Sequence, residues 1–204
     1  MEHTSASKAG RKRVSSRAML EEAASELFLE NTYAGTTVEQ IALRAGVSRN
    51  TFFNYFDAKS DVLWAGVDDA ISALCTTLSQ PVGERGALEA VREMLIGAAR
   101  WFGPGQLPLA VTQYDVMGAQ DELKTSALPR FLRLAEAVER FLSSAQTGAE
   151  RPPAKVIAFA LVAAIAAAGD EWARAGTARH PLSEYVGAAI TPIVRGFSPS
   201  ATHR

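Results

Sequence analysis

The side chains of this chain that are best suited to bind a partner are concentrated between residues 37 and 59. Arg49, Asn50 and Asn54 can each form two hydrogen bonds to one planar partner. Arginine matches O6 and N7 of guanine, and asparagine matches N6 and N7 of adenine. Four further side chains suit phosphate oxygens, which fix position without reading base sequence; they are Thr37, Thr51, Tyr55 and Lys59. The stretch therefore predicts contact with nucleic acid.

The basic residues around this stretch have more than one interpretation. Arg44 suits a phosphate oxygen, but it could equally lie solvated on a helix surface. Residues 1–17 carry a net charge of +4 and the remainder −5, within a total of −1. A basic arm on an acidic body is typical of a chain that meets a polyanion at one end. The basic arm, residues 1–14, is therefore expected to be disordered and either to reach DNA or to remain a solvated tail.

Two short helices joined by a tight turn are expected to position these side chains. Thr36 or Thr37 can cap the first helix, with an acidic or amide residue three positions on, as in a capping box. Gly46 supplies the backbone freedom of the turn, and Ser48 caps the second helix, which is expected to run through Phe56. A preceding helix has one apolar face with helical spacing, formed by Leu20, Ala23, Ala24, Leu27 and Phe28. This layout predicts a helix-turn-helix unit.

Residues 17–63 resemble the DNA-binding domain of the tetracycline-repressor (TetR) family, without gaps. The shared pattern is Ala24, Leu27, Phe28, Thr36, Thr37, Val38, Ile41, Ala42, Ala45, Gly46, Val47, Ser48, Thr51, Phe53, Tyr55, Phe56, Lys59 and Leu63. Three positions depart from the family. Phe53 replaces a common tyrosine and lacks its phosphate-contacting hydroxyl, whereas Tyr55 replaces a common histidine and could restore that contact. Asn31-Thr32 stands where a glycine is common, so the end of the first helix is a place where this chain can differ.

The periodicity along the whole chain is helical, and strand signals are absent. We expect an all-α protein of about nine helices with four parts: an arm (1–14), the helix-turn-helix domain (15–60), an effector-binding and dimerisation domain (61–198) and a tail (199–204). Helices in the third part are expected at 61–79, 87–102, 110–120, 128–145, 155–175 and 181–197. Pro129 is expected at a helix start, and Pro192 is expected to kink or shorten the last helix.

The resemblance implies a homodimer whose interface is formed by the last two long helices, 155–175 and 181–197. Its expected interface residues are Phe159, Val162, Ile165, Ala166, Tyr185 and Ile193. The first of these helices is apolar on nearly all sides, which requires burial; a purely intramolecular core helix is the alternative. Its longest apolar run, residues 156–169, is shorter than the roughly 20 residues of a membrane span. We therefore expect no membrane association.

The resemblance also implies a pocket for a small effector between the DNA-binding domain and the dimer interface. Aromatic residues and methionine with a few polar groups suit an apolar or acyl-type molecule; the candidates are Trp101, Phe102, Gln113, Tyr114, Met117, Phe131, Arg133 and Trp172. For any single one of them, core packing is the alternative. A bound effector is expected to shift the helix at 61–79 and change the spacing of the two DNA-binding domains.

Several functions are excluded or disfavoured by what the sequence lacks. One cysteine and three histidines do not form a cysteine-rich zinc site or a disulfide framework, and no nucleophile, Walker or dinucleotide motif is present. We expect no cofactor, metal or catalytic site, and a cytoplasmic location. The expected function is a dimeric, ligand-responsive transcriptional regulator, most simply a repressor of a palindromic operator. The alternatives are a small-molecule-binding protein or enzyme with a vestigial DNA-binding domain, and a sequence-blind nucleoid protein.

Overall fold

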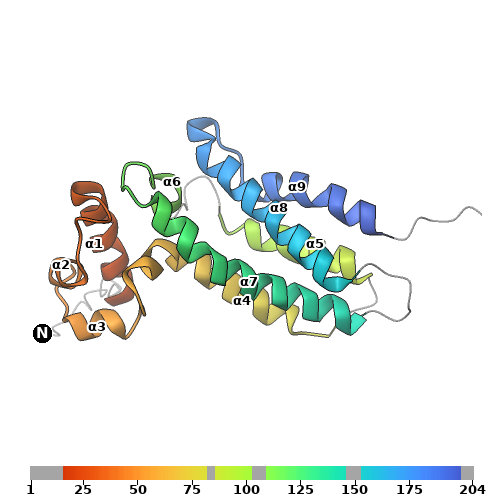
Figure 1. The fold of residues 1–204 in the computed structure, drawn as a ribbon, viewed down its shortest axis with the longest axis horizontal. Coiled ribbons are helices and arrows are strands. Elements are labelled where there is room, and N and C mark those ends of the chain that lie inside the picture. Colours follow the sequence, from red (N-terminus) through yellow and green to blue (C-terminus); the bar gives the residue numbers. More distant parts are fainter. Residues whose placement is uncertain (1–15, 82–85, 103–108, 146–152, 199–204) are drawn as a thin grey trace, which may run out of the picture.

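The computed structural model describes residues 16–81, 86–102, 109–145 and 153–198. The elements in these ranges are all helical, which confirms the predicted class. They are α1 (Ser16–Asn31), α2 (Val38–Arg44), α3 (Arg49–Phe53), the 3₁₀ helix η1 (Lys59–Trp64), α4 (Ala65–Leu78), α5 (Ala87–Ala99), α6 (Leu109–Thr112), α7 (Gln120–Ala145), α8 (Ala154–Arg174), the 3₁₀ helix η2 (Gly176–Ala178) and α9 (Leu182–Phe197). The basic arm and the tail lie outside the described residues. Figure 1 shows α1–α3 as a small bundle at one end of an elongated body made of α4–α9.

Local sequence signals set the starts of α2 and α3 as predicted, although α3 ends at Phe53 instead of running through Phe56. The Thr37 hydroxyl accepts from the Gln40 backbone N–H at 3.2 Å, and the Gln40 side chain accepts from the Thr37 N–H at 2.7 Å. The Ser48 hydroxyl accepts from the Thr51 N–H at 3.1 Å. Gly46 takes a φ of +68°, a left-handed conformation that glycine adopts at low cost. Together the two caps and this turn set α3 against α2.

In the link between α1 and α2, a threonine takes a backbone conformation that usually favours glycine. Thr32 itself takes the left-handed conformation, with a φ of +64°. Its carbonyl accepts from the Thr36 hydroxyl at 2.8 Å, and Thr36 is almost fully buried. Of the two threonines that could cap α2, Thr37 is therefore the cap, and Thr36 fastens the end of α1.

The core of the N-terminal bundle extends into the body. Leu20, Phe28, Ile41 and Phe52 are buried with at most 1% of their surface exposed. The same apolar cluster includes Leu63 and Trp64 of η1, Met117 and Ala119 of the α6–α7 link, and Ala127 of α7. α1–α3 thus rest on a platform formed by η1 and the first part of α7.

A second apolar cluster joins α4, α5, α7, α8 and α9. α8 packs against α7 and α9 (Figure 1), and its buried residues from Ala154 to Ala168 are part of this cluster. Among the described helices, α8 has the length and mean hydropathy that could cross a membrane. Part of that apolar surface packs inside the protein, and Val156 and Phe159 remain exposed.

The boundaries of several body helices differ from the sequence predictions. α7 begins at Gln120 rather than at 128, so Pro129 lies inside it. Pro129 is exposed, and the neighbouring Arg130 side chain donates to the Ser126 carbonyl at 2.7 Å within the same turn. α9 continues through Pro192 to Phe197 and is not shortened.

The other two differences concern short elements. α6 covers only Leu109–Thr112 of the helix expected at 110–120, because the chain turns at Gly118 with a φ of +60°. The helix expected from 61 is a 3₁₀ turn up to Trp64, and α4 starts at Ala65. The Asp61 carboxylate accepts from the Ala58 N–H at 2.8 Å and fixes the start of that turn.

Candidate nucleic-acid interface and effector cavity

One side of α3 is exposed and polar, whereas the other side is buried. Phe52 is completely buried against α1 and α2, which fixes the rotation of the short helix. The side chains predicted to read bases, Arg49, Asn50 and Asn54, are all exposed. Phe53 and Tyr55 are exposed by 39% and 46% beside them. The structure therefore brings the predicted base-contacting residues together on one surface.

Arg49 is held by two neighbours in this surface. Its Nε donates to Oε1 of Glu39 at 2.6 Å, and its guanidinium carbon lies 4.7 Å from the centroid of the Phe53 ring. The pKa of Glu39 is lowered, first by its own backbone N–H and then by Arg49. Sequence reasoning assigned Glu39 no role beyond helix capping, because the Glu39–Arg49 pair spans the turn and follows no helical spacing.

The predicted phosphate-contacting hydroxyls also shape the local backbone. Thr37 and Ser48 cap α2 and α3, and the Ser48 and Thr51 hydroxyl oxygens lie 2.9 Å apart, joined by one hydrogen bond. Thr37 and Ser48 are exposed and Thr51 is half-buried. A capping oxygen accepts from the backbone and keeps its own proton to donate; the Thr37 hydroxyl has the Glu39 carboxylate as one acceptor, for which a phosphate would have to compete.

Lys59 is folded back onto the protein. Its ammonium donates to the carbonyls of Tyr33 and Thr36, each at 2.7 Å, and lies 4.0 Å from the Tyr33 ring centroid. Burial lowers the pKa of Lys59, and burial raises the pKa of Tyr33 to about 12. Two of the three ammonium N–H donors thus tie η1 to the α1–α2 link, a role that spacing along the chain did not reveal.

Arg44 has a third arrangement that neither interpretation of the sequence included. Its guanidinium forms ion pairs with Glu26 at 3.0 Å and with Glu30 at 2.8 Å, both on α1. These hydrogen bonds raise the pKa of Arg44. Arg44 therefore joins α2 to α1, and a phosphate would have to compete with two carboxylates for it.

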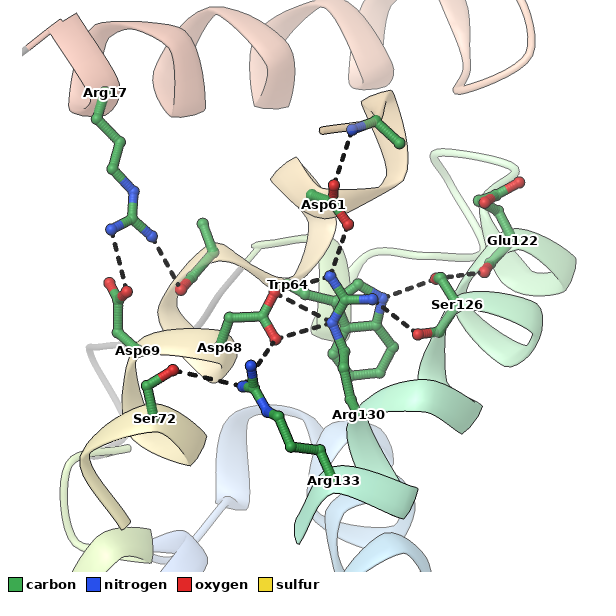
Figure 2. Close-up of polar contacts among 12 residues, drawn as sticks. Arg17, Asp61, Trp64, Asp68, Asp69, Ser72, Glu122, Ser126, Arg130 and Arg133 are labelled. Atoms are coloured by element: carbon green, nitrogen blue, oxygen red, sulfur yellow. Dashed lines mark hydrogen bonds and ion pairs between the residues drawn. The ribbon is translucent and has the colours of Figure 1, made fainter. Parts of the chain in front are cut away.

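A polar network joins the N-terminal bundle of α1–α3 to the body (Figure 2). Arg130 of α7, whose side chain is only 11% exposed, donates to Asp68 of α4 at 2.7 Å and to Asp61 of η1 at 2.8 Å. Burial alone would lower the pKa of Arg130, but the hydrogen bonds and charges of the two aspartates outweigh it and raise the pKa. Arg17 of α1 reaches the same region and pairs with Asp69 at 3.0 Å.

An apolar cavity of about 350 Å³ lies on the other side of this network. Trp64 lies between the network and the cavity. The centroid of its ring is 5.2 Å from the guanidinium carbon of Arg130 and 6.5 Å from the centroid of the Phe131 ring. Its indole N–H donates to the Ser126 hydroxyl at 2.8 Å. Most of the lining is apolar and comes from α4, α5, α7, α8 and α9. Polar groups line the cavity near the start of α7 and the end of α8; they are Tyr114, Gln120, Lys124, Asp170 and Arg174.

Half of the residues predicted to contact an effector line this cavity. Those that do are Phe102, Tyr114, Phe131 and Trp172. Trp101 and Gln113 are exposed outside it, and Met117 is completely buried in the N-terminal cluster. Arg133 faces α4, 3.9 Å from Asp68. Gln113 and Met117 lie in the turn that follows α6, where a helix was expected, and Trp101 lies just after the end of α5.

The predicted interface residues divide between two faces of α8 and α9. Val162, Ile165 and Ala166 line the cavity; Val162 is buried, whereas Ile165 and Ala166 are half-buried. Phe159 and Val156 of α8 are exposed by 41% and 52%, and Tyr185 and Ile193 of α9 are half-buried. An apolar outer surface therefore remains at the α8–α9 pair, although three of the six predicted interface residues also line the cavity.

The architecture is that of a helix-turn-helix domain on a helical body with a ligand-sized cavity. Residues 20–65 match the family model described as bacterial regulatory proteins, tetR family. Over 192 residues the chain is 22% identical to the Mycobacterium tuberculosis protein that carries the name mycofactocin biosynthesis transcriptional regulator MftR, covering 94% of this chain and 96% of that protein. The helix-turn-helix region of this chain is thus similar to the regulatory proteins of the tetR family.

Solved structures show the same fold over nearly the whole chain. SmeT, the repressor of the SmeDEF multidrug efflux pump of Stenotrophomonas maltophilia, aligns with a TM-score of 0.59 at 20% identity, covering 92% of this chain and 93% of SmeT. FadR of Thermus thermophilus, solved with lauroyl-CoA, aligns with a TM-score of 0.56 at 21% identity, covering 92% and 98%. SmeT has also been solved with triclosan. The chain has the fold of TetR-family repressors.

Proposed function

We propose that this protein is a dimeric transcriptional regulator of the cytoplasm, a repressor that binds a palindromic operator and is released by a small hydrophobic effector. The observation that carries the proposal is the exposed polar side of α3, where Arg49, Asn50 and Asn54 stand together while Phe52 anchors the helix. A helix presented in this way fits the major groove, where such side chains distinguish base pairs.

The apolar outer surface of α8 and α9 supports the dimer. One α3 helix of five residues contacts too few bases for selective binding, so two copies on a two-fold axis are needed. Phe159 and Val156 are large apolar side chains left exposed on α8, and an isologous contact through them would bury both copies at once.

The cavity supports an effector that is largely apolar. Its volume of about 350 Å³ is in the range of small-molecule sites, and polar side chains are confined to one end. Triclosan in SmeT is largely apolar, and lauroyl-CoA in FadR joins an apolar acyl chain to a charged coenzyme A group, so each of these ligands of proteins with this fold has an apolar part. A ligand of that kind would contact Trp64 and Phe131 and leave a polar end near Lys124 or Arg174.

The wall shared by the cavity and the polar network supplies a route for release. A ligand that displaces the Trp64 ring also disturbs Arg130, which holds α4 and η1 through Asp68 and Asp61. Because η1 carries Lys59, which is bonded to the α1–α2 link, a shift of η1 moves α1–α3 relative to the body. Thermodynamic linkage then requires operator and effector to weaken each other by the same factor.

A gel-shift titration against the DNA flanking the protein's own gene, at stated salt, tests this function. We expect a discrete complex that competitor DNA of unrelated sequence does not remove, and that hydrophobic compounds selected by thermal shift dissociate. Absence of any complex would favour a small-molecule-binding protein or enzyme with a vestigial DNA-binding domain. Equal affinity for all duplexes would indicate a sequence-blind DNA-binding protein.

A further inference from the structure

We propose that Glu39 of α2 is a specificity-determining residue that positions the Arg49 guanidinium for bidentate recognition of guanine. This inference rests on the proposed function, because it concerns how α3 reads a duplex. Glu39 itself does not contact the base; it acts through Arg49.

The geometry leaves the correct part of Arg49 available. Glu39 accepts from Nε, which is the inner N–H of the guanidinium, at 2.6 Å. The two terminal nitrogens, Nη1 and Nη2, carry the four remaining donors and form the planar fork that matches O6 and N7 of guanine. A carboxylate on either terminal nitrogen would block this fork, whereas a carboxylate on Nε only orients it.

Phe53 restricts the second degree of freedom. Its ring lies 4.7 Å from the guanidinium carbon, and packs edge-on against the buried Phe52 ring at 5.4 Å. The hydrogen bond sets the direction of the guanidinium and the ring supports one of its faces. Arg49 therefore loses less side-chain freedom on binding than an unrestrained arginine would.

The exposure of the pair argues that its role is not folding stability. The side chains of Arg49 and Glu39 are 57% and 61% exposed, and exposed ion pairs contribute little to stability. An acidic side chain at a DNA-contacting surface also repels phosphate and weakens binding to any duplex. A residue that weakens general binding while orienting a base-reading arginine raises the ratio of specific to non-specific affinity.

A double-mutant cycle on the full-length protein tests this role. The variants are Glu39→Ala, Arg49→Ala and the double variant, with Glu39→Gln as a conservative change and Glu22→Gln as a control that removes an exposed acidic charge from α1. For each, fluorescence anisotropy gives the affinity for the selected operator, for operators with single base-pair changes, and for an unrelated duplex. Thermal melting checks that each variant is folded.

We expect Glu39→Ala to lower the operator-to-unrelated affinity ratio by about tenfold, the scale of one bidentate pair. The affinity for the unrelated duplex should stay constant or increase. The loss should fall at the base pair whose recognition Arg49→Ala also abolishes, and the double variant should lose no more than Arg49→Ala alone. Glu39→Gln keeps an acceptor oxygen, so its operator-to-unrelated affinity ratio should lie between those of the wild type and Glu39→Ala. The ratio of Glu22→Gln should equal that of the wild type.

Three results would overturn the inference while the wild type still binds its operator. The first is an unchanged operator-to-unrelated affinity ratio in Glu39→Ala. The second is a gain in the operator affinity of Glu39→Ala that exceeds its gain in affinity for the unrelated duplex. The third is a loss of operator affinity in the double variant that equals the sum of the losses in the two single variants. A wild-type protein that binds no duplex would overturn the proposed function itself.

Discussion

At the residue scale, the most unusual feature is the left-handed conformation of Thr32. Its φ of +64° costs a residue with a β-branched side chain about 1–2 kcal/mol. The conformation persists because the Thr32 carbonyl accepts from Thr36 and the end of α1 must turn toward α2. The absence of the common glycine indicated that the end of α1 could differ at this site. It did not indicate whether the link would follow another path or whether Thr32 would itself adopt the left-handed conformation of a glycine.

Thr32→Gly is expected to stabilise the protein. Glycine removes the strain of the left-handed conformation in the folded state. It also makes the unfolded chain more flexible, and this entropic cost of folding cancels about half of the free energy gained. We predict a rise in Tm of about 2 °C by differential scanning calorimetry. The control is Ala34→Gly in the same link, where φ is not positive, and where the same change should lower Tm. A lower Tm in Thr32→Gly would contradict the strain argument.

Residues with local partners could be predicted, whereas residues with distant partners could not. The caps at Thr37 and Ser48 follow from groups three positions away, and both are present. Lys59 and Arg44 find their partners 14–26 residues away, in the α1–α2 link and on α1. Nothing in their spacing distinguishes such contacts from phosphate binding, so the structure alone reveals these ties.

At the scale of elements, the junction of η1, α4 and α7 connects the N-terminal bundle to the body. Arg130 is the residue that joins all three, and its two aspartate partners are each 27% exposed (Figure 2). The sequence predicted a helix on each side of this junction. It could not predict the junction itself, because α7 was expected to begin only at residue 128, just before Arg130.

Arg130→Met is expected to destabilise the protein by about 3 kcal/mol in urea unfolding, because Asp61 and Asp68 lose a partly buried partner. The matched control is Arg140→Met on the same helix, where the arginine is 69% exposed and pairs only weakly with Glu136. Arg130→Met should also reduce the effect of effector on operator affinity. Equal stability of the two variants would contradict the proposed role of the junction.

At the scale of the whole molecule, α8 serves two surfaces. Val162, Ile165 and Ala166 face the cavity, whereas Phe159 and Val156 remain on the outside. The all-round apolar pattern of α8 predicted burial on most sides but not which residues belong to which surface. That division depends on how α7 and α9 pack against it, and therefore on contacts far apart in the sequence.

The most direct test of the account is to select bound duplexes from a random pool and measure how many protomers bind the selected sequence. Sedimentation of a labelled duplex gives this number. We predict an inverted repeat with half-sites about 10 base pairs or more apart, with one pair of protomers on each repeat. Phe159→Glu should abolish pairing, and Leu128→Glu should not, although Leu128 of α7 is an apolar side chain that is even more exposed, by 60% against 41% for Phe159. An asymmetric selected sequence, or one protomer on each duplex, would contradict the account.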